Sequence, residues 1–598
     1  MTTKSEERAM TERVKGASFL IEETDPQAVF TPEDFTEEHK MIASTTEEFV
    51  ENEVLPVIDR IEQDHDFATS VALMRKAGEL GLLGGDVPEA YGGLGLDKIS
   101  TTIVTEKFAR ARSFSLTYGA HVGIGTLPIV FFGTEAQKKK YLPDLAAGKK
   151  IAAYALTEPG SGSDALGAKT TATLSPDGTH YILNGEKQWI TNAGFADVFV
   201  VYAKVDGDKF SAFIVERAFP GVSTGAEEKK MGIEGSSTRT LILQDARVPV
   251  ENLLGEVGRG HVIAFNILNI GRWKLAAGCV GSAKRAVELS AQYAKQRKQF
   301  GRPIASFPLI QQKLADMAIR TYVMESMVYR TAGLFDGALG VLPADADGQT
   351  AAKAIADYAV ECSVNKVFAT EALDFIVDEG VQIHGGYGYM REYEIENLYR
   401  GSRINRIFEG TNEINRLLIP DMLVKKALRG ELALLPAAQA LQQELVAFVP
   451  TEPGDAPLER EADLVRRAKK LFLFLSGLAV QKHQQALERE QELLAAVADC
   501  VIEVFAMESA LLRAQKAIAR DGLEKAALKV AYTQAYVQDA FDKLERIGRT
   551  ALAALEEGDA LRAQLAVLRK LVRRTPLNAV ALKRQIAARV LEAERYVS

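Results

Sequence analysis

Residues 198–217, VFVVYAKVDGDKFSAFIVER, decide the fold class of this chain. Two runs rich in Val, Ile, Tyr and Phe are separated by Asp206-Gly207, a pair that is typical of a β-hairpin turn. Further turn signals, SPDG at 175–178 and Asn184-Gly185, come at short intervals in the surrounding sequence. We therefore predict a small β domain, a sandwich or barrel, in the middle of the chain.

The sequence on both sides of this β domain is helical in pattern. Apolar residues recur at three- and four-residue steps, as in Met41-Thr45-Phe49, and residues 274–297 form a long Ala-rich stretch that is typical of a buried bundle helix. A Pro-, Gly- and acid-rich stretch at 450–457 indicates a linker before another helical unit. The predicted fold is mostly α with a central β domain, an α–β–α architecture with an added C-terminal helical domain. We expect an N-terminal extension at residues 1–35, an N-terminal helical domain at 36–150 and a central β domain at 151–260. A helical bundle domain at 261–430, a linker at 431–457 and a C-terminal helical domain at 458–598 should follow.

The composition excludes several classes of protein. The chain has 598 residues with 47% hydrophobic and 25% charged residues, which is ordinary for globular domains. Its net charge of −8 gives no general attraction to nucleic acid. The three cysteines lie far apart, so neither a disulfide framework nor a metal site is expected. We find no signal peptide and no apolar run that approaches a membrane span, and we expect a cytoplasmic bacterial protein.

Two motifs flank the start of the β domain. The segment 154–164, YALTEPGSGSD, is a Gly- and Ser-rich loop whose exposed N–H groups suit a flat polar ring or a phosphate. In 187–192, KQWITN, a tryptophan stands beside a threonine hydroxyl, a combination that suits an isoalloxazine ring. Taken separately, the first segment could be an interdomain turn and the second could hold a core tryptophan.

Two more motifs lie in the second helical zone. The segment 382–389, QIHGGYGY, permits close approach of the backbone to a ligand, but it is not a Rossmann fingerprint. In 406–416, RIFEGTNEINR, Glu409 stands between Phe408 and Gly410 among apolar residues. Its carboxylate should be partly desolvated with a raised pKa, as a general base requires. The alternative is an acid at a helix N-terminus, capped by Thr411 and Asn412.

The joint occurrence of ALTEPGSGSD, QWITN, RKQFG (297–301), HGGYGY and FEGTNEINR resembles the acyl-CoA dehydrogenase family over residues 35–425. The IFEGTNEI form of the last motif, EKKMGI (228–233) and LNIGRW (268–273) are most similar to the very-long-chain branch, which has an extra C-terminal helical domain. The tail beyond residue 458 resembles that branch mainly in length and helical character.

This resemblance implies an FAD-dependent oxidation of a fatty acyl-CoA to a trans-2-enoyl-CoA, as in fatty acid β-oxidation. Glu409 would be the catalytic base, its own N–H would help to stabilise the enolate oxygen, and the β-hydrogen would pass as hydride to flavin N5. Gly271 matches the position where some members of the family carry the catalytic base instead. Glycine cannot act as a base, because it has no side chain. Matched cofactor-binding residues are Tyr154, Leu156, Thr157, Ser163, Trp189, Thr191, Arg297, Gln382, Gly385, Gly386, Thr411 and Glu413. Gln299 and Pro308 depart from the pattern of many relatives.

The resemblance also implies the substrate contacts and the partners. Matched substrate residues are Ser163, Ala120, Gly123, Arg272, Phe408 and Gly410. Small residues in 118–125, YGAHVGIG, leave room for a long acyl chain, although close helix packing would also explain them. We expect a homodimer, because the family shares FAD between subunits, and an electron-transferring flavoprotein as the electron acceptor. The basic residues after position 561 could contact an anionic membrane, or form a solvated face or a dimer contact.

Other functions remain open. An acyl-CoA oxidase would pass the electrons to oxygen, and an assembly or scaffold relative would retain little activity. A nitroalkane- or amine-directed relative with the same fold is a third alternative, but such relatives typically replace the base that Glu409 provides.

Overall fold

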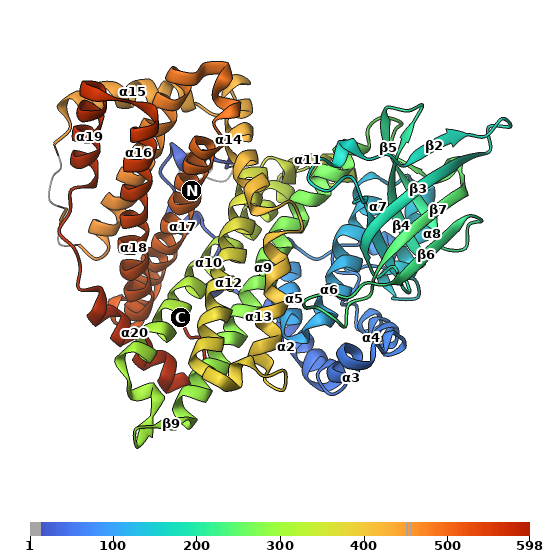
Figure 1. Cartoon of the computed structure of the whole chain (residues 1–598), viewed down its shortest axis with the longest axis horizontal. Coiled ribbons are helices and arrows are strands. Elements are labelled where there is room, and N and C mark those ends of the chain that lie inside the picture. Colours follow the sequence, from blue (N-terminus) through green and yellow to red (C-terminus); the bar gives the residue numbers. More distant parts are fainter. Residues whose placement is uncertain (1–13, 450–452, 455) are drawn as a thin grey trace, which may run out of the picture.

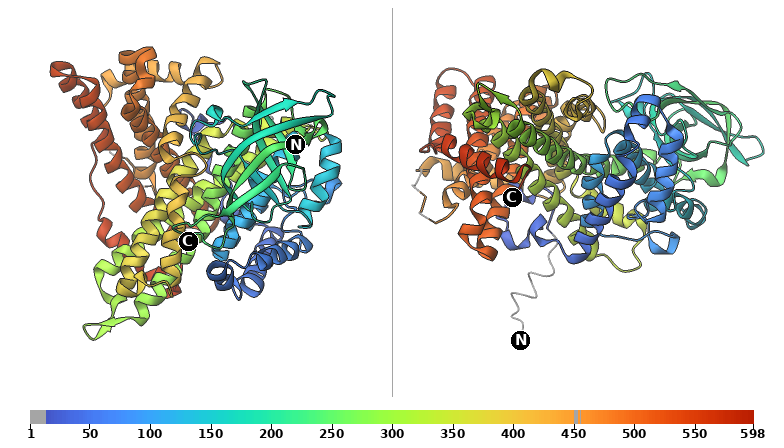
Figure 2. Two further views of the ribbon diagram at one scale, coloured as in Figure 1. Left: turned by 45° about the vertical axis from the view of Figure 1, so that its right-hand side comes forward. Right: turned by 90° about the horizontal axis from the view of Figure 1, so that it is seen from below.

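The structure, a computed structural model, describes residues 14–449, 453–454 and 456–598. Figure 1 shows three groups of elements side by side: the β-sheet with the N-terminal helices, a central bundle of long helices, and the C-terminal helices. Both turned views in Figure 2 keep the bundle between the other two groups. The predicted α–β–α core with an additional helical domain is therefore confirmed.

The N-terminal helical domain consists of short helices that begin at capping side chains. Thr36, Asp66, Asp97 and Thr134 each accept a hydrogen bond from a backbone N–H in the first turn of the helix that follows. The helices are α2 (Glu37–Phe49), α3 (Ile58–Asp64), α4 (Phe67–Glu79), α5 (Lys98–Phe108), α6 (Ser113–Gly119), α7 (Leu127–Phe132) and α8 (Glu135–Ala146).

A π-helical segment, Ala120–Gly125, joins α6 to α7 and makes one continuous helical run. The run Ser113–Phe132 has 20 residues and a mean hydropathy of 1.3, so the expectation that no apolar run approaches a membrane span is wrong. Its most apolar window is 78% buried against other parts of the protein. This burial explains the apolar composition, since core helices have the same composition as spans.

All eight strands of the central domain are hydrogen-bonded into one mixed sheet, in the order β6-β7-β3-β2-β4-β5-β8 with β1 paired to β4. The strands are β1 (Ala152–Ala155), β2 (Thr171–Leu174), β3 (His180–Thr191), β4 (Val198–Val205), β5 (Lys209–Glu216), β6 (Val222–Glu227), β7 (Thr238–Pro249) and β8 (Leu253–Leu254). The register of β3 against β7 shifts between Lys187 and Ile190. This bulge contains Trp189, whose φ of 59° is left-handed, and bulges commonly redirect a side chain.

The helical bundle contains α9 (Gly260–Gln296), α10 (Pro308–Gly340), α11 (Gly348–Ala356), α12 (Ala359–His384), α13 (Glu394–Ser402) and α14 (Asn412–Leu428). Glycine lets α9 cross α5 closely: a Cβ on Gly281 would lie only 2.0 Å from the carbonyl oxygen of Glu106 and 2.7 Å from Cβ of Ala109. The backbone of α5 is therefore in direct contact with α9 at this crossing.

The C-terminal helices are α15 (Leu434–Ala447), α16 (Glu459–His483), α17 (Gln491–Asp521), α18 (Leu523–Leu555), α19 (Gly558–Val572) and α20 (Ala579–Ala593). The prediction of a linker over 431–457 is wrong for most of its length, because α15 fills residues 434–447. Pro436 did not prevent this helix, since a proline in the first turn removes no intrahelical hydrogen bond. Residues 450–452 and 455 of the predicted linker, and residues 1–13 of the predicted N-terminal extension, lie outside the described residues.

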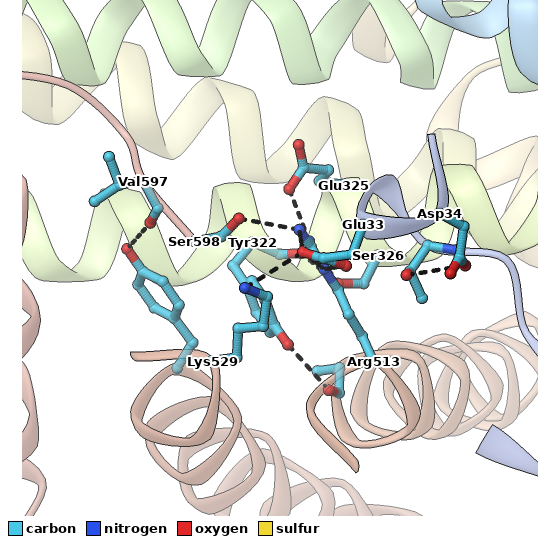
Figure 3. A network of polar contacts seen from close by, with 12 residues as sticks. Glu33, Asp34, Tyr322, Glu325, Ser326, Arg513, Lys529, Val597 and Ser598 are labelled. Atoms are coloured by element: carbon cyan, nitrogen blue, oxygen red, sulfur yellow. Dashed lines mark hydrogen bonds and ion pairs between the residues drawn. The ribbon is translucent and has the colours of Figure 1, made fainter. Parts of the chain in front are cut away.

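A buried ion cluster holds the N-terminal segment, α10 and the C-terminal domain together (Figure 3). We call Glu33, Glu325, Arg513 and Lys529 the Arg513 cluster. The Arg513 guanidinium, from α17, binds Glu33 at 2.7 Å and Glu325 of α10 at 2.7 Å, and Lys529 lies 3.5 Å from Glu33. Burial alone would raise the pKa of Glu33, but Arg513 and Lys529 lower it to about 2, so the cluster stays charged at neutral pH.

Candidate active site

Glu409 stands in a short turn between the 3-10 helix Arg403–Arg406 and α14. Its φ is 57°, and that of Gly410 is 77°. A left-handed glutamate is strained, and such strain persists only where the surroundings impose it. Here Asn415 donates to the carbonyls of Gly410 at 2.9 Å and Thr411 at 3.1 Å. These hydrogen bonds hold the turn at Glu409 and Gly410 in place.

The carboxylate of Glu409 is packed against the backbone of α9. Its Oε2 is shielded from solvent and has no hydrogen-bond partner among the described residues. A Cβ on Gly271 would lie 2.7 Å from this oxygen. The glycine therefore leaves the space that the carboxylate occupies, and an unsatisfied carboxylate oxygen remains available to a ligand.

Burial and two cations determine the proton affinity of Glu409. Burial raises its pKa from 4.5 to about 7, although the positive charges of Arg272 and Lys366 act to lower it. Arg272 donates through Nε to the Glu409 carbonyl at 3.1 Å. Lys366 donates to the Gly410 carbonyl at 2.7 Å, and burial lowers its own pKa to about 8. A carboxylate with a pKa near 7 is suited to accept a proton at neutral pH.

A cavity leads away from Glu409. The predicted substrate residues Ala120, Gly123 and Phe408 line it together with Glu409. A Cβ on the neighbouring Gly119 would meet no atom within 4 Å, so this part of the wall is open rather than closely packed. The predicted substrate residues Arg272, Gly410 and Ser163 are not among the side chains that line the cavity.

The loop predicted to hold a flat ring is fixed by a buried ion pair. Lys187, on β3, lies 2.6 Å from Glu158 and donates to the carbonyl of Leu156 at 3.2 Å. The N–H of Gln188 donates to the carbonyl of Thr157 at 2.8 Å. The loop is therefore tied to β3 immediately before Trp189.

The residues predicted to contact the flavin ring differ in exposure. Trp189 is 60% exposed, which is unusual for so large an apolar side chain, and Thr191 lines the cavity with Glu409. Tyr154 and Leu156 are buried, while Ser163 is exposed and Thr157 is half-buried.

A second cavity contains three residues predicted to bind the far side of the cofactor, Arg297, Gly385 and Gly386. The Arg297 guanidinium lies 5.4 Å from the centre of the Tyr387 ring. The exposed Gln382 is not among its lining residues. Within the single chain this cavity shares no lining residue with the one at Glu409.

The two residues predicted after the base begin α14. Thr411 is its N-cap, and its hydroxyl accepts a hydrogen bond from the N–H of Ile414 at 3.2 Å. Glu413 is exposed in the first turn of this helix. The capping interpretation of the motif and the base interpretation are therefore compatible, because Thr411 provides the cap and Glu409 does not.

Sequence reasoning missed several residues that hold the site. Lys366, Asn415 and Lys187 all bind the backbone of the two loops described above. A charged residue within a buried apolar stretch was the available signal, because Lys366 stands in VNKVFAT and Lys187 stands in an alternating strand. Buried charges are rare unless they are paired.

Four family profiles match the chain along most of its length. The N-terminal domain of acyl-CoA dehydrogenase matches residues 36–149, the middle domain residues 153–246, and two C-terminal domain families residues 258–423 and 467–570. The chain is 66% identical over 584 residues to the probable acyl-CoA dehydrogenase of Bacillus subtilis (strain 168), covering 97% of this chain and 98% of that one.

Similarity extends to other curated proteins and to solved structures. The chain is 37% identical over 511 residues to the human mitochondrial very long-chain specific acyl-CoA dehydrogenase, which covers 79% of this chain and 75% of that one. It is 39% identical over 398 residues to CarC, a subunit of the caffeyl-CoA reductase-Etf complex of Acetobacterium woodii, covering 66% of this chain and 100% of that one. The crystal structure of a Bacillus anthracis acyl-CoA dehydrogenase complexed with FAD superimposes with a TM-score of 0.97 at 63% identity, covering 98% of this chain and 100% of that one.

Proposed function

The chain belongs to the acyl-CoA dehydrogenase family of FAD-dependent oxidoreductases, and from this premise we propose that it oxidises long-chain fatty acyl-CoA in β-oxidation, with Glu409 as the base. The observation that carries the role of Glu409 is its Oε2 oxygen, which is buried, unpaired among the described residues and directed to a cavity wall at Gly271.

Glu409 would remove the α-proton of the thioester at Oε2. With a pKa of about 7, a large fraction of this carboxyl is ionised and ready to accept a proton at neutral pH. The N–H of Glu409 donates no hydrogen bond within the described part of the chain. It is therefore available to the thioester oxygen, where negative charge develops as the proton leaves.

The residues of the flavin side fit FAD. The indole of Trp189 is exposed on a bulge next to Thr191, and a Cβ on Gly160 or Gly162 would meet no atom within 4 Å, so the facing loop is open. When bound, FAD supplies the two-electron acceptor for the hydrogen that leaves the β-carbon. Trp189 and Thr191 would hold the ring, and Arg297 with Gly385 would bind its phosphate and adenosine side.

A preference for long chains is supported by the glycine wall of the cavity. A Cβ on Gly123 would meet only the Lys274 Cδ, at 3.9 Å. Small residues at Gly119, Ala120 and Gly123 therefore widen the passage. We expect kcat/KM to rise from butyryl-CoA to octanoyl-CoA to hexadecanoyl-CoA. Similar kcat/KM values for the C4 and C16 substrates would contradict this preference.

The main experiment is the anaerobic addition of hexadecanoyl-CoA to the purified flavoprotein and to Glu409→Gln. We expect bleaching of the flavin band near roughly 450 nm in the wild type and none in the variant, with equal flavin content in both. Bleaching of the variant at the wild-type rate would show that another group is the base. No bleaching of a fully flavinated wild type would contradict the proposed reaction.

The electron acceptor and the oligomeric state are part of the proposal. CarC, the relative in a complex with Etf, supports an electron-transferring flavoprotein as the acceptor. The separation of Arg297 and Gly385 from the Glu409 cavity supports a homodimer in which each subunit completes the cofactor site of the other. Sedimentation velocity tests the dimer. Peroxide formation with hexadecanoyl-CoA and oxygen alone would instead indicate an oxidase.

Peripheral contact with an anionic membrane remains a subsidiary proposal. Arg569, Lys570 and Arg584 are exposed, whereas Lys583 pairs with Asp316 at 2.9 Å and is therefore used within the protein. Flotation of the full-length protein with phosphatidylserine vesicles should occur at low salt and be lost at high salt. Flotation that does not differ from that with neutral vesicles would exclude a charge-driven contact.

A further inference from the structure

The cavity at Glu409 extends far along α9. Gly271, which contacts the Glu409 carboxylate, and Ser282 both line it. These residues are eleven positions apart, which corresponds to about 16 Å along a helix axis. The α5 residue Thr105 lines the same end as Ser282, because the neighbouring Glu106 crosses α9 at Gly281. When the α-carbon of an acyl chain lies at Glu409, the far end of a long chain can therefore extend to the end of the cavity at Ser282 and Thr105.

The chemistry of the wall changes toward this end. Near Glu409 and along the middle, the wall carries the apolar side chains Phe408, Leu275, Leu116 and Leu373. Two polar residues, Asn405 and Lys274, also line the cavity, and the ammonium of Lys274 is paired with Asp86. At the distant end, polar and charged side chains gather from α5, α6, α9, α13 and the turn before α6. The distant-end group consists of Thr105, Arg112, Ser113, Ser115, Ser282 and Asn397. A terminal methyl group gains little from such a wall, since hydrophobic stabilisation needs apolar surroundings.

A buried carboxylate, Glu62, organises this group. It accepts hydrogen bonds from the Ser113 hydroxyl at 2.6 Å and the Asn397 amide at 2.9 Å, and it is ion-paired with Arg112. Arg112 also binds Asp59 at 2.7 Å. The single positive charge of the distant-end group is therefore paired with two negative charges, Glu62 and Asp59, that lie behind the cavity wall.

One donor of the group is left without an acceptor. Nε of Arg112 is shielded from solvent and has no hydrogen-bond partner among the described residues. A buried donor of this kind is stabilised by any ligand oxygen that can accept its hydrogen. A neutral oxygen suits the site better than a carboxylate, because Glu62 and Asp59 repel a further negative charge.

From the distant-end group we propose that the cavity binds acyl-CoA substrates that carry a neutral hydroxyl at the ω-carbon of a long chain. The hydroxyl would rest among Arg112, Ser282 and Asn397, while the apolar middle of the cavity holds the methylene chain. The inference rests on the proposed function, since the thioester must be placed at Glu409 for the ω-end to reach this group.

The test compares the effect of a terminal hydroxyl group at two chain lengths, which place it at two positions along the cavity. kcat/KM is measured for 16-hydroxyhexadecanoyl-CoA against hexadecanoyl-CoA, and for 8-hydroxyoctanoyl-CoA against octanoyl-CoA. In the long pair we expect the hydroxylated substrate to be at least as good as the plain one. In the short pair we expect the hydroxyl to lower kcat/KM at least about tenfold, because it would be buried against the apolar middle of the cavity. The same loss at both lengths would overturn the proposal.

Two further arms define the chemistry of the site. Hexadecanedioyl-CoA, with an ω-carboxylate, should be at least about tenfold poorer than the ω-hydroxy substrate, and a preference for the diacid would overturn the neutral-hydroxyl assignment. Ser282→Ala should lower the ratio of ω-hydroxy to plain C16 activity about threefold, as expected for one lost neutral hydrogen bond. Ser290→Ala, two turns further along α9 and buried outside the cavity, should leave this ratio unchanged. Equal ratios in the two variants would contradict a role for Ser282.

The two proposals fail in different ways. If octanoyl- and hexadecanoyl-CoA do not bleach the flavin, the dehydrogenase proposal fails and the ω-site falls with it. If both are oxidised but the hydroxyl has the same effect at either length, only the ω-site is disproved.

Discussion

At the scale of single residues, the turn that contains Glu409 and the neighbouring helix α9 bury its carboxyl group and so change its pKa. Burial raises its pKa to about 7 while Lys366 and Arg272 oppose the rise. Because the base acts when deprotonated, kcat/KM should increase as the pH rises through about 7 and level off above it. A pH profile from 5.5 to 9 with hexadecanoyl-CoA measures this, and a flat profile would contradict the assignment.

Removing one of the opposing charges should move this profile in a defined direction. Lys366→Met removes a positive charge that lowers the pKa of Glu409, so the ascending limb should shift to higher pH by at least about half a unit. Lys353→Met, at an exposed position on α11, should leave the profile in place. Flavin content is measured in parallel, and a shift to lower pH would contradict the electrostatic argument.

Gly271 provides the second prediction at this scale. In Gly271→Ala the new methyl would lie 2.7 Å from Oε2 of Glu409, so the carboxylate must move, and displacement of a reacting group by about 1 Å commonly costs about a hundredfold in rate. We expect kcat to fall at least tenfold while the flavin remains bound. Gly337→Ala, where a Cβ would meet nothing within 4 Å, is the control. Wild-type kcat in Gly271→Ala would show that the contact is not maintained in solution.

The sequence allowed part of this site to be predicted and not the rest. The desolvation of Glu409 followed from its neighbours Phe408 and Gly410, which are adjacent in the chain. The contacts of Lys366 and Asn415 with the turn could not be predicted, because Lys366 lies 44 residues from Gly410. Such contacts depend on how helices pack, which periodicity does not specify.

At the scale of elements, the alternation and turn signals of residues 198–217 predicted a hairpin, and β4 and β5 pair in register from Val198 with Glu216 to Val205 with Lys209. The prediction of a linker failed at α15, because the Pro-, Gly- and acid-rich signal covers only 450–457 while residues 434–447 form a helix. Local patterns thus identified the hairpin but missed a whole helix that lies beside the linker signal.

The crossing of α5 and α9 gives a prediction for one element pair. Gly281→Ala places a methyl 2.0 Å from the Glu106 carbonyl oxygen, and such overpacking typically destabilises by about 1–3 kcal/mol. Gly278→Ala, one turn earlier on the same helix, meets no atom within 4 Å and should be neutral or stabilising. Urea unfolding of both variants measures the difference, and equal stability of the two would contradict the close crossing.

At the scale of the whole molecule, the Arg513 cluster is the connection to test. Arg513→Met leaves Glu33 buried without its main partner and leaves Glu325 with Lys284 as its remaining cationic partner, and breaking a buried ion pair in this way costs about 3–5 kcal/mol. Lys516→Met, on the same helix, removes the partly exposed pair with Asp34 and a hydrogen bond to the Val29 carbonyl, and should cost about 1–2 kcal/mol. Thermal unfolding and limited proteolysis after residue 20 compare the two, and equal losses would contradict a special role for Arg513.

The pKa shift of Glu33 in this cluster has the opposite direction to that of the base Glu409. The pKa of Glu33 is lowered to about 2 from 4.5, so its contribution to stability is fully present above about pH 4.5 and is lost as the pH falls toward 2. The wild type and Arg513→Met should therefore differ in stability at pH 7 and converge toward pH 2. The sequence could not predict this cluster, since nothing local relates Glu33 to Arg513.

The separation between these two residues has a consequence for how the protein is made. The contact of Glu33 with Arg513 spans 480 positions, so at about 5–20 residues per second a ribosome needs roughly 24–96 s to deliver Arg513 after Glu33. During that interval Phe19 and Leu20, which are buried in the finished protein, have no α17 to pack against. The emerging N-terminal segment is thus exposed to chaperones and proteases until synthesis reaches the C-terminal helices.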